Sequence, residues 1–544
     1  MIKTIDGIMY LNMLRAGAER LNSNRAAVND LNVFPIPDGD TGDNMFMTVN
    51  AGASKAAGGE NISAAAGSAA REMLLGARGN SGVILSRIFA GIAKGMGEAG
   101  LLDTKGFIKA MRQGVAESYA AVSSPVEGTI LTVYREGVEK LEEAQPDSFE
   151  ELFEELLPAL AASLEHTPEL LDVLKDAGVV DSGGAGLVYI VQGMKEALGG
   201  QRYEALSMNG AADHGPDLDA FTEDSVLEYG YCTEFLLRLQ RSKTDIDSFD
   251  TDAFTGWLNS VGDSVVCFKE GSIVKVHVHT KTPGDILNEC QRYGEFLTTK
   301  IENMTLQHNG SHGMQELKLR NKKHKKPYGI VAVASGEGLK ELFTSLGCDV
   351  VVDGGQSMNP SAEELVRAFD EASADVIYVF PNNSNIIMTA MQAAELYSYA
   401  DVRVIRSKTV GEGYAAVSMF DPSSGDADEI TRSLNEAVGS VVTGMVSRAS
   451  RDVSGEVEVV KDDYIGFVGD HIYVDAKTPE EAMLGLCGSL DAGGHDILLI
   501  LAGADAGDSA AAKMADELSA RYKRSEVIML NGGQPVFDYI LILN

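Results

Sequence analysis

Apolar positions in the first 203 residues recur at intervals of three and four. Leu11, Leu14, Ala18 and Leu21 follow this spacing, and residues 83–89 repeat it further along the chain. Such spacing is typical of helices that bury one face, and long runs of β-branched residues, which favour strands, are absent from this region. The pattern predicts an all-α bundle over residues 1–203, whose connecting loops carry Gly, Asp and Asn.

The periodicity changes after residue 203. Residues 204–220 are polar and rich in turn formers, which marks a boundary. Residues 229–239 and 271–280 alternate between apolar and polar side chains as strands do, and a helical pattern follows at 282–294. We therefore expect a small α+β domain over 204–310. A run of Lys and Arg that ends in a proline then predicts an exposed basic linker over 311–327.

From residue 328 onward, strand-like and helix-like segments alternate, which predicts an α/β domain with a largely parallel sheet. Two stretches within 328–544 share one order: a strand, a loop with glycine, a helix, a second strand and the triplet GGQ. The triplets stand at 354–356 and 532–534. The sequence thus predicts a C-terminal domain of two related halves, and a multidomain protein overall.

Composition restricts the class of protein. The 544 residues are enough for three or four domains, and the net charge of −35 argues against general nucleic-acid binding and against a basic membrane-surface protein. No signal peptide is recognisable, and no apolar stretch approaches the roughly 18–20 residues that span a bilayer. Five scattered cysteines without a CxxC pair fit a reducing compartment. We expect a cytoplasmic protein without stable membrane insertion.

The segment PIPDGDTGDNM at 35–45 is the first candidate for chemistry. Two prolines impose an extended approach, and Asp38 and Asp40 stand two residues apart just before a helix expected to start near Asn44. Paired carboxylates beside a helix N-terminus suit a Mg²⁺–nucleotide site. A solvated Asp/Gly turn that caps a helix explains the same residues equally well. An EF-hand calcium loop is excluded, because Gly42 stands where that pattern needs an acid.

Two more loops have a similar character. GARGNSG at 76–82 and VDSGGAG at 180–186 both precede helical segments, and Thr129 lies between them in EGTILTV. Glycine-rich loops that lead into helices can bind phosphate through backbone N–H groups, although each loop alone is a weak signal. Several such loops in one helical domain indicate a site at one end of the bundle.

These four motifs, in order and spacing, resemble the nucleotide-binding domain of the L subunit of dihydroxyacetone kinase. The complete layout, with YGYCTEF and VKVHVHT in the middle domain and GGQ motifs in the last, resembles the A subunit of bacterial fatty acid kinase. The resemblance implies an N-terminal eight-helix barrel that binds ATP through two Mg²⁺ ions. It also implies a homodimer formed through the middle domain, and a C-terminal domain that docks a separate fatty-acid-binding carrier protein, the B subunit.

Residue by residue, the resemblance assigns the metal ligands to Asp38 and Asp40, which we expect to be the catalytic residues. A further upstream aspartate of the family is matched, with an offset of one position, by Asn32, while Asp43 occupies a variable position. The expected phosphate and nucleotide contacts are Thr41, Asn44, Asn80, Ser81, Gly82 and Thr129. The loop that closes over the nucleoside is matched by Asp181 and Gly183.

The middle domain holds a second candidate metal site. In VKVHVH, three valines alternate with Lys275, His277 and His279, so both imidazoles belong to one strand face. Two histidines and a cysteine elsewhere suit zinc, but a strand with a solvated polar face gives the same pattern. The resemblance favours zinc held by Cys232, His277 and His279. The fourth ligand stays open between water, Glu234 and His308.

The resemblance implies transfer of phosphate from ATP to a carrier-bound fatty acid, which gives acyl phosphate for phospholipid synthesis. A carboxylate acceptor is already ionised at neutral pH, so no general base is needed, and none is evident among the nine histidines. Asn382, Asn383 and Asn385 are candidates for the edge that docks the carrier. The alternatives are a kinase for a dihydroxyacetone-like small molecule and a non-catalytic nucleotide-binding zinc scaffold.

Overall fold

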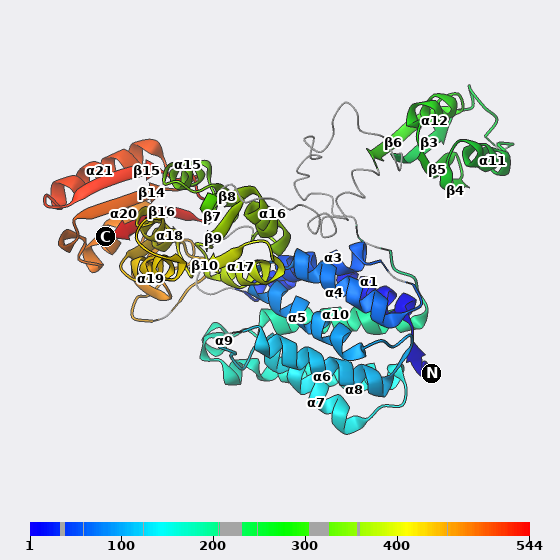
Figure 1. The fold of residues 1–544 in the computed structure, drawn as a ribbon, viewed down its shortest axis with the longest axis horizontal. Helices are drawn as coiled ribbons and strands as arrows, with labels where there is room; N and C mark the ends of the chain where they lie inside the picture. The colour runs from blue at the N-terminus through cyan, green and yellow to red at the C-terminus, as the bar shows by residue number, and fades with distance from the viewer. Residues whose placement is uncertain are drawn as a thin grey trace. The chain divides into compact units, whose positions relative to one another are not determined.

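The computed structural model of this chain describes residues 1–32, 39–57, 59–122, 124–204, 206, 231–246, 248–303, 326–355, 359–453 and 455–543. Two compact units are present. One combines Met1–Ser207 with His324–Asn544, and the other is Met208–Lys323. The helical domain and the C-terminal α/β domain therefore lie in the same unit, an association that the division of the sequence into successive domains did not predict (Figure 1).

The N-terminal domain is helical, as its periodicity predicts. Its described residues include eight helices of at least 15 residues: α1 (Gly7–Ser23), α3 (Thr41–Lys55), α4 (Ile62–Gly76), α5 (Gly79–Met96), α6 (Thr104–Ala120), α7 (Ile130–Ala144), α8 (Phe149–Leu170) and α10 (Ser182–Glu196). Helices α2 (Arg25–Asp30) and α9 (Asp172–Ala177) are short. Strands β1 (Thr4–Ile5) and β2 (Leu102–Asp103) form a small antiparallel ribbon, so the domain is not strictly all-α.

The apolar stripe of α1 explains why this helix lies where it does. Leu11, Leu14, Ala18 and Leu21 are all buried, and they join one apolar core with residues of the other long helices. Burial of such a stripe supplies most of the stability of a helix in a protein. The amphipathic spacing predicted from the sequence is thus confirmed, while closure of the helices into a barrel stays a prediction.

The unit Met208–Lys323 has an antiparallel sheet in the order β4-β5-β3-β6. Its elements are β3 (Tyr231–Leu239), α11 (Thr251–Val261), β4 (Asp263–Glu270), β5 (Ile273–Thr280), α12 (Pro283–Cys290) and β6 (Gly294–Asn303). Val274, Val276 and Val278 of β5 are fully buried. The antiparallel sheet with its two helices confirms the α+β prediction, and the three buried valines lie on one face of β5, as their spacing predicts.

The C-terminal domain begins with a parallel four-stranded sheet in the order β10-β9-β7-β8. Its elements are β7 (Lys326–Ala334), α15 (Glu337–Ser345), β8 (Val350–Asp353), α16 (Ala362–Ala372), β9 (Ala374–Phe380), α17 (Ser384–Leu396), β10 (Asp401–Val404), α18 (Val410–Ser418) and α19 (Ala427–Val438). Strand β7 starts at Lys326, so it includes the last two residues of the predicted linker.

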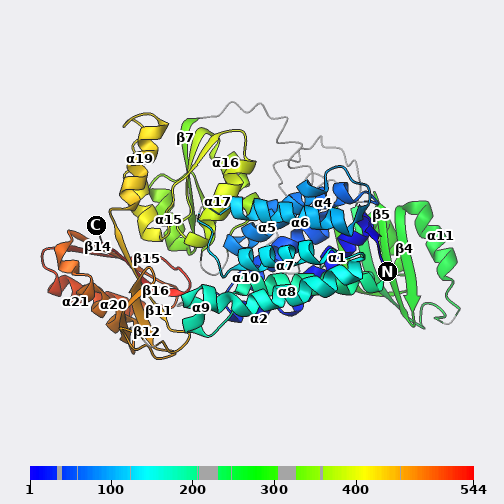
Figure 2. The same cartoon turned by 90° about the horizontal axis from the view of Figure 1, so that it is seen from below.

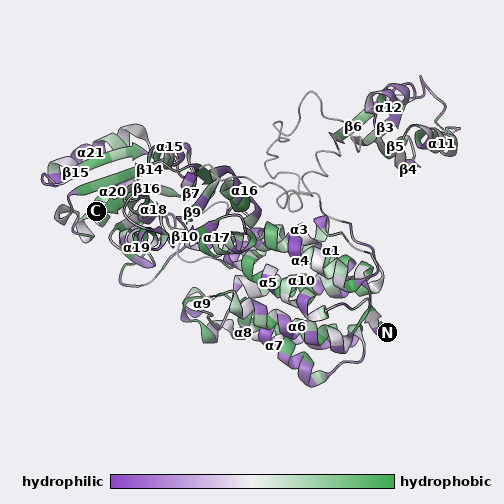
Figure 3. Cartoon of the chain, in the orientation of Figure 1, coloured by the Kyte–Doolittle hydropathy of each residue, from purple (hydrophilic) through white to green (hydrophobic). Residues whose placement is uncertain are grey.

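A second sheet, of six strands, has the order β13-β12-β11-β16-β14-β15. Its elements are β11 (Val442–Arg448), β12 (Tyr464–Val468), β13 (His471–Ala476), α20 (Pro479–Ser489), β14 (Ile497–Ala502), α21 (Asp508–Arg521), β15 (Glu526–Asn531) and β16 (Phe537–Leu543). Figure 3 shows β14 and β16 as mostly hydrophobic, in keeping with their central positions.

The expectation of a largely parallel sheet is right for the first half and wrong for the second. In the six-stranded sheet β14 and β15 are parallel, whereas the other described pairs are antiparallel. The connection between β12 and β13 is too short for the crossover that parallel strands require. The repeated sequence pattern does correspond to two parallel strand–helix–strand units, β7–α15–β8 and β14–α21–β15.

Helices α16 and α17 connect the two domains of the larger unit. They pack against α4 and α5, as both views show (Figures 1 and 2). The amide of Ala362 donates to the carbonyl oxygen of Ala77 at 3.2 Å, and the Gln392 side chain donates to that of Leu74 at 2.6 Å. These bonds lie at the turn from α4 to α5, where one of the glycine-rich motifs lies.

Among the described residues, no helix combines the length and the apolar character needed to cross a bilayer.

Candidate nucleotide site

The starts of α3, α7 and α10 lie together in the helical domain. Ser182 donates a hydrogen bond from its hydroxyl to Thr41 Oγ1 at 3.3 Å, which joins the first residues of α10 and α3. The Asp181 carboxylate accepts from the backbone N–H groups of Gly184, at 2.6 Å, and Ile130, so it joins the starts of α10 and α7. Helix starts carry positive dipole ends, which favour anions. Some of the first N–H groups of these helices are already paired: Asp181 accepts those of Gly184 and Ile130, and Asn29 Oδ1 accepts those of Gly42 and Asp43.

The start of α5 joins this group through its glycines. Gly79 has φ of +57°, and a Cβ there would lie 2.6 Å from Asn44 Nδ2 of α3. A Cβ at Gly82 would overlap the Thr48 hydroxyl and would lie 3.2 Å from the Asn44 carbonyl oxygen. These two glycines let α5 approach α3 closely, so Gly82, predicted as a phosphate contact, has a packing role that the sequence did not reveal.

Helices α3 and α5 start earlier than the sequence indicated. Helix α3 begins at Thr41 rather than near Asn44, and α5 begins at Gly79, inside the motif expected to precede it. As a result Asn80, Ser81 and Gly82 belong to the first turn of α5. By their position, the N–H groups of Asn80 and Ser81 have no acceptor within the helix and can bind an anion. The N–H of Gly82 instead donates to the Arg78 carbonyl oxygen at 3.2 Å.

Asp40 occupies the residue before α3 and is 9% exposed. Its side chain does not cap the helix. Instead, Oδ2 accepts a hydrogen bond of 2.6 Å from the Asn359 side-chain amide of the C-terminal domain. The other expected metal ligand of this loop, Asp38, lies outside the described residues, so its role stays a prediction.

Asp43 has a different set of partners. Arg25 approaches its Oδ1 at 3.1 Å, and the Asn29 side-chain amide donates to its Oδ2 at 2.6 Å. These contacts fix the corner between α2 and α3, so the carboxylate is used in packing. Asn32 follows α2, and its backbone N–H donates to the Asn29 carbonyl oxygen.

Four more predicted residues stand at helix starts. Asn80 donates from its side-chain amide to Asn385 at 3.1 Å, whereas its own buried Oδ1 has no hydrogen-bond partner in the described part of the chain. Ser81 is half-buried beside it. The Thr129 hydroxyl accepts from the Leu131 N–H and donates to the Val126 carbonyl, so it caps α7. Gly183 is buried against Ile130.

The donor set of this region fits a magnesium–nucleotide complex. A carboxylate, Asp40, and an unpaired amide oxygen, on Asn80, lie where α3 and α5 start. Mg²⁺ takes oxygen ligands, and phosphate oxygens accept from backbone N–H groups at helix starts. The residues of this region therefore suit both parts of such a ligand, the cation and the phosphates.

Sequence reasoning missed Arg78, Ser182 and Asn359. Arg78 was visible as a cation inside a glycine-rich motif, and Ser182 as a hydroxyl next to the predicted Asp181. No local signal marks Asn359, because it lies 319 residues away from Asp40 along the chain.

Burial raises the pKa of Asp181 to about 6, and the N–H groups of Gly184 and Ile130 oppose this shift only in part. The folded protein thus binds the Asp181 proton more tightly than the unfolded chain does. The resulting stabilisation of the folded state is complete below the ordinary pKa near 4 and is lost as pH rises through about 6. Across that window the free energy of unfolding should fall by at most about 1.4 kcal/mol per pH unit on this account.

We expect Asp181→Asn to remove this dependence, because Asn still caps a helix but carries no charge to bury. The test is thermal melting of parent and variant at about pH 5 and about pH 7.5, which bracket the shifted pKa. The variant should gain stability relative to the parent at the higher pH. If the difference in melting temperature between variant and parent were the same at both pH values, the Asp181 carboxyl would not be the responsible group.

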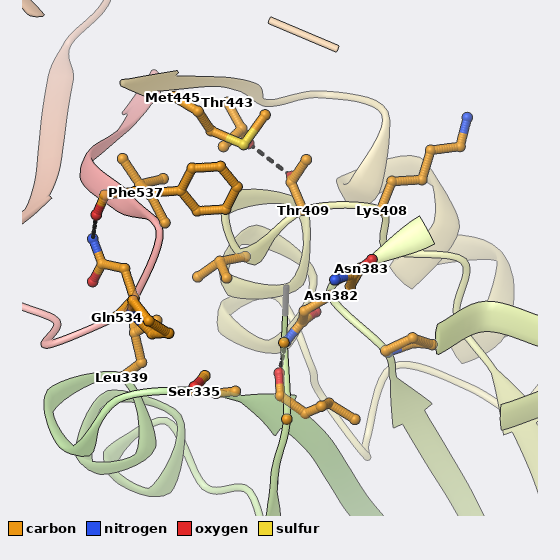
Figure 4. Close-up of a pocket in the computed structure, with 18 residues that line it drawn as sticks. Ser335, Leu339, Asn382, Asn383, Lys408, Thr409, Thr443, Met445, Gln534 and Phe537 are labelled. Carbon is orange, nitrogen blue, oxygen red and sulfur yellow. Dashed lines mark hydrogen bonds between the residues drawn. The ribbon is translucent and has the colours of Figure 1, made fainter. Parts of the chain in front are cut away.

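A separate cavity of about 50 Å³ lies in the C-terminal domain, between the ends of β7 and β9 and the six-stranded sheet (Figure 4). Its polar lining includes Ser335, Thr409 and Thr443, and the two threonine hydroxyls are 3.0 Å apart. Pockets for small-molecule ligands usually measure about 300–1,000 Å³. In the described state the cavity is too small for an acyl chain.

The asparagines suggested for carrier docking occupy other positions. Asn382 and Asn383 are 6% and 4% exposed and line this cavity, and Asn382 is held by Ser407 and the Val333 carbonyl. Asn385 contacts Asn80 of the helical domain. The suggestion is therefore wrong for Asn382 and Asn383, because the edge of the sheet at which they lie is covered by the second half of the domain.

The zinc prediction falls on side chains outside the described part of the structure. Backbone pairing places Cys232 directly opposite His279, and Glu234 directly opposite His277. Among the described residues, no group of three or more His, Cys, Asp or Glu side chains could hold a metal ion. His308 is not described either, so the zinc site stays a prediction.

Family models match the chain in three successive segments. The DAK2 domain matches residues 35–196, and the middle and C-terminal domains of FakA-like proteins, which are similar to the A subunit of fatty acid kinase, match 228–311 and 329–544. Among solved structures, the chain is similar to DegV, a fatty acid binding protein from Bacillus subtilis. The match has 15% sequence identity and a TM-score of 0.31, and it covers 40% of this chain and 99% of DegV. A dihydroxyacetone kinase from C. freundii, in complex with AMP-PNP and Mg2+, also matches. That match has 17% sequence identity and a TM-score of 0.27, and it covers 34% of this chain and 33% of the kinase.

Sequence relatives match over nearly their whole length. Protein YloV of Bacillus subtilis (strain 168) is 38% identical over 555 residues, which cover 99% of each chain. An uncharacterized protein of Staphylococcus epidermidis (strain ATCC 12228 / FDA PCI 1200) is 35% identical over 552 residues, again with 99% of each chain. With its kinase-like DAK2 domain and both further domains matched, this chain belongs to the FakA-like family, the proteins that are similar to the A subunit of fatty acid kinase.

Proposed function

We propose that this protein is the ATP-dependent catalytic subunit of a fatty acid kinase, which phosphorylates a fatty acid presented by a separate carrier protein. The products would be an acyl phosphate and ADP. The family supports a kinase with fatty-acid-related chemistry, and the observation that carries the proposal is the group of helix starts around Asp40. Bound Mg²⁺ would neutralise charge on the triphosphate during transfer.

Each part of the site has a proposed task. Asp40, with Asp38, holds the cations, and the first turn of α5 binds phosphate oxygens through its N–H groups. In α3 the N–H groups of Gly42 and Asp43 already donate to Asn29 Oδ1, so this helix contributes its positive dipole end. Asn80 and Asn44 orient the nucleotide, and Asp181 and Gly183 border its nucleoside. The Thr129 hydroxyl is already hydrogen-bonded in the cap of α7, so its proposed task is to fix the start of that helix.

The acceptor needs no deprotonation. A fatty acid carboxyl, with an ordinary pKa of about 4–5, is ionised at neutral pH, so its oxygen can attack the γ-phosphorus as the bond to the β-phosphate oxygen breaks. No proton moves, and ADP leaves as an anion. The task of the protein is therefore to position two anions and to offset their repulsion.

Two features of the family remain part of the proposal. The middle unit would mediate homodimerisation and would hold zinc through Cys232, His277 and His279. The acyl tunnel would lie in the carrier, consistent with the small size of the cavity lined by Ser335, Thr409 and Thr443.

The test is transfer of radiolabelled phosphate from ATP to oleate by the purified full-length protein, with and without a fatty-acid-binding carrier protein. We expect a labelled acyl phosphate only when carrier, oleate and Mg²⁺ are all present. Transfer to dihydroxyacetone without a carrier would establish the small-molecule kinase instead. Nucleotide binding with no transfer in any mixture would establish a non-catalytic scaffold.

A further inference from the structure

The C-terminal domain reaches the start of α3 with one buried side chain. Asn359 is 2% exposed, and its amide donates to Asp40 Oδ2 at 2.6 Å. Asp40 is itself 9% exposed. Hydrogen bonds to ionised groups are about twice as strong as those between neutral groups, so this bond restricts the orientation of the carboxylate.

The same amide lies at the start of α5. Asn359 Nδ2 is 3.2 Å from the position that a Cβ on Gly79 would occupy, and Asn44 borders that glycine. The Oδ1 atom of Asn359 is buried and has no hydrogen-bond partner in the described part of the chain. Buried polar atoms are rarely left unpaired, and this one lies where a nucleotide with its hydrated cation would supply a partner.

Asn359 is held in place from the helical domain. Arg78 donates from Nη1 to the Asn359 carbonyl oxygen at 2.6 Å, and its Nη2 lies 3.1 Å from Glu364 Oε2. Glu364 in turn caps α16 together with Ser361. Since Arg78 belongs to the glycine-rich motif of α5, this arrangement ties the Asn359 loop to the phosphate-binding end of the bundle.

We propose that Asn359 is a positioning residue of the kinase site. By holding Asp40 Oδ2, it fixes the orientation in which the carboxylate meets the cation. The C-terminal domain thereby completes the magnesium site of the helical domain. This inference rests on the proposed function, because it requires that Asp40 binds a cation. Groups that orient a metal ligand typically contribute about 10- to 100-fold to metal affinity or activity.

The experiment measures how much Mg²⁺ is needed for binding of a non-hydrolysable ATP analogue to the full-length protein. Asn359→Ala should raise the half-saturating Mg²⁺ concentration by about 10- to 100-fold, and excess Mg²⁺ should restore both binding and the rate of phosphoryl transfer. Asn359→Ser, which retains a polar group too short to reach Asp40, should behave in the same way. It also provides a second test if the alanine variant folds poorly.

Gln392→Ala is the matched control. Gln392 is equally buried in the junction and contacts Leu74 and Arg87, but it is not bonded to Asp40. This variant should melt at a lower temperature and keep the Mg²⁺ requirement of the parent. An equal rise in the Mg²⁺ requirement for Gln392→Ala would mean that domain packing, rather than Asn359, is responsible, and would overturn the proposal.

Two results for Asn359→Ala would also overturn it. An unchanged Mg²⁺ requirement would make the contact incidental, and a lower requirement would show that Asn359 blocks the site. A parent protein that binds no nucleotide in the presence of Mg²⁺ would instead refute the proposed function, so the two failures are distinguishable.

Discussion

Replacing Asp40 by Asn should abolish magnesium-dependent nucleotide binding and lower phosphoryl transfer by at least about 1,000-fold. The substitution keeps the size of the side chain but removes the charge that holds the cation. Metal stabilisation of transferring phosphate contributes several kcal/mol, and each 1.4 kcal/mol corresponds to about tenfold in rate. The measurement is phosphate transfer at saturating ATP, together with the melting temperature to show that the variant is folded.

Asp43→Asn is the matched control, since both aspartates lie at the start of the same helix. Asp43 pairs with Arg25 and Asn29, so its charge serves the corner between α2 and α3. Loss of one partly exposed ion pair costs about 0–1 kcal/mol, which should lower the melting temperature only slightly. Equal loss of transfer in both variants would mean that the loop needs its total charge rather than the Asp40 carboxylate.

Gly82→Ala should destabilise the helical domain by about 1–3 kcal/mol and weaken nucleotide binding, because the added methyl group overlaps Thr48 between α3 and α5. Thr48 cannot move freely: its hydroxyl donates to the Asn44 carbonyl oxygen at 2.7 Å. Displacement of Thr48 would therefore disturb the part of α3 that carries the predicted nucleotide contacts. Thermal melting by circular dichroism and nucleotide titration measure the two effects.

The control for Gly82 is Gly67→Ala in α4. Gly67 lies inside a helix, is exposed, and would have no atom within 4 Å of an added Cβ. Alanine is a better helix former by about 1 kcal/mol, so this variant should melt at the same or a higher temperature. If Gly82→Ala were as stable as Gly67→Ala and bound nucleotide normally, close approach of α5 to α3 would not be the reason for that glycine.

The features that sequence predicted well are local. The stripe of Leu11, Leu14, Ala18 and Leu21 predicts a buried helix face, and a capping residue such as Asp181 predicts where the next helix begins. The loops with Asp40, Gly82 and Thr129 could be grouped into one site because each precedes or begins a helix and their motifs occur in a known order. In the structure these loops lie close together because the helices that follow them pack against one another.

The features that sequence could not predict depend on distant parts of the chain. The contact between Asp40 and Asn359 joins segments in different domains, and neither segment carries a pattern that refers to the other. Likewise, β16 inserts between β11 and β14 and makes the second sheet mostly antiparallel, although the repeat in sequence suggested a second parallel sheet. Periodicity reports which face of an element is buried, not which strand becomes its neighbour.

Asp40 and its surroundings are proposed to bind a triphosphate through a divalent cation. Isothermal titration calorimetry of the full-length protein with ATP measures this binding in three conditions: with Mg²⁺, with a chelator, and with the Asp40→Asn variant in Mg²⁺. We expect saturable ATP binding by the parent in Mg²⁺, and none with the chelator or in the variant. ATP binding that is equally tight without Mg²⁺, or unchanged by loss of the Asp40 charge, would contradict it.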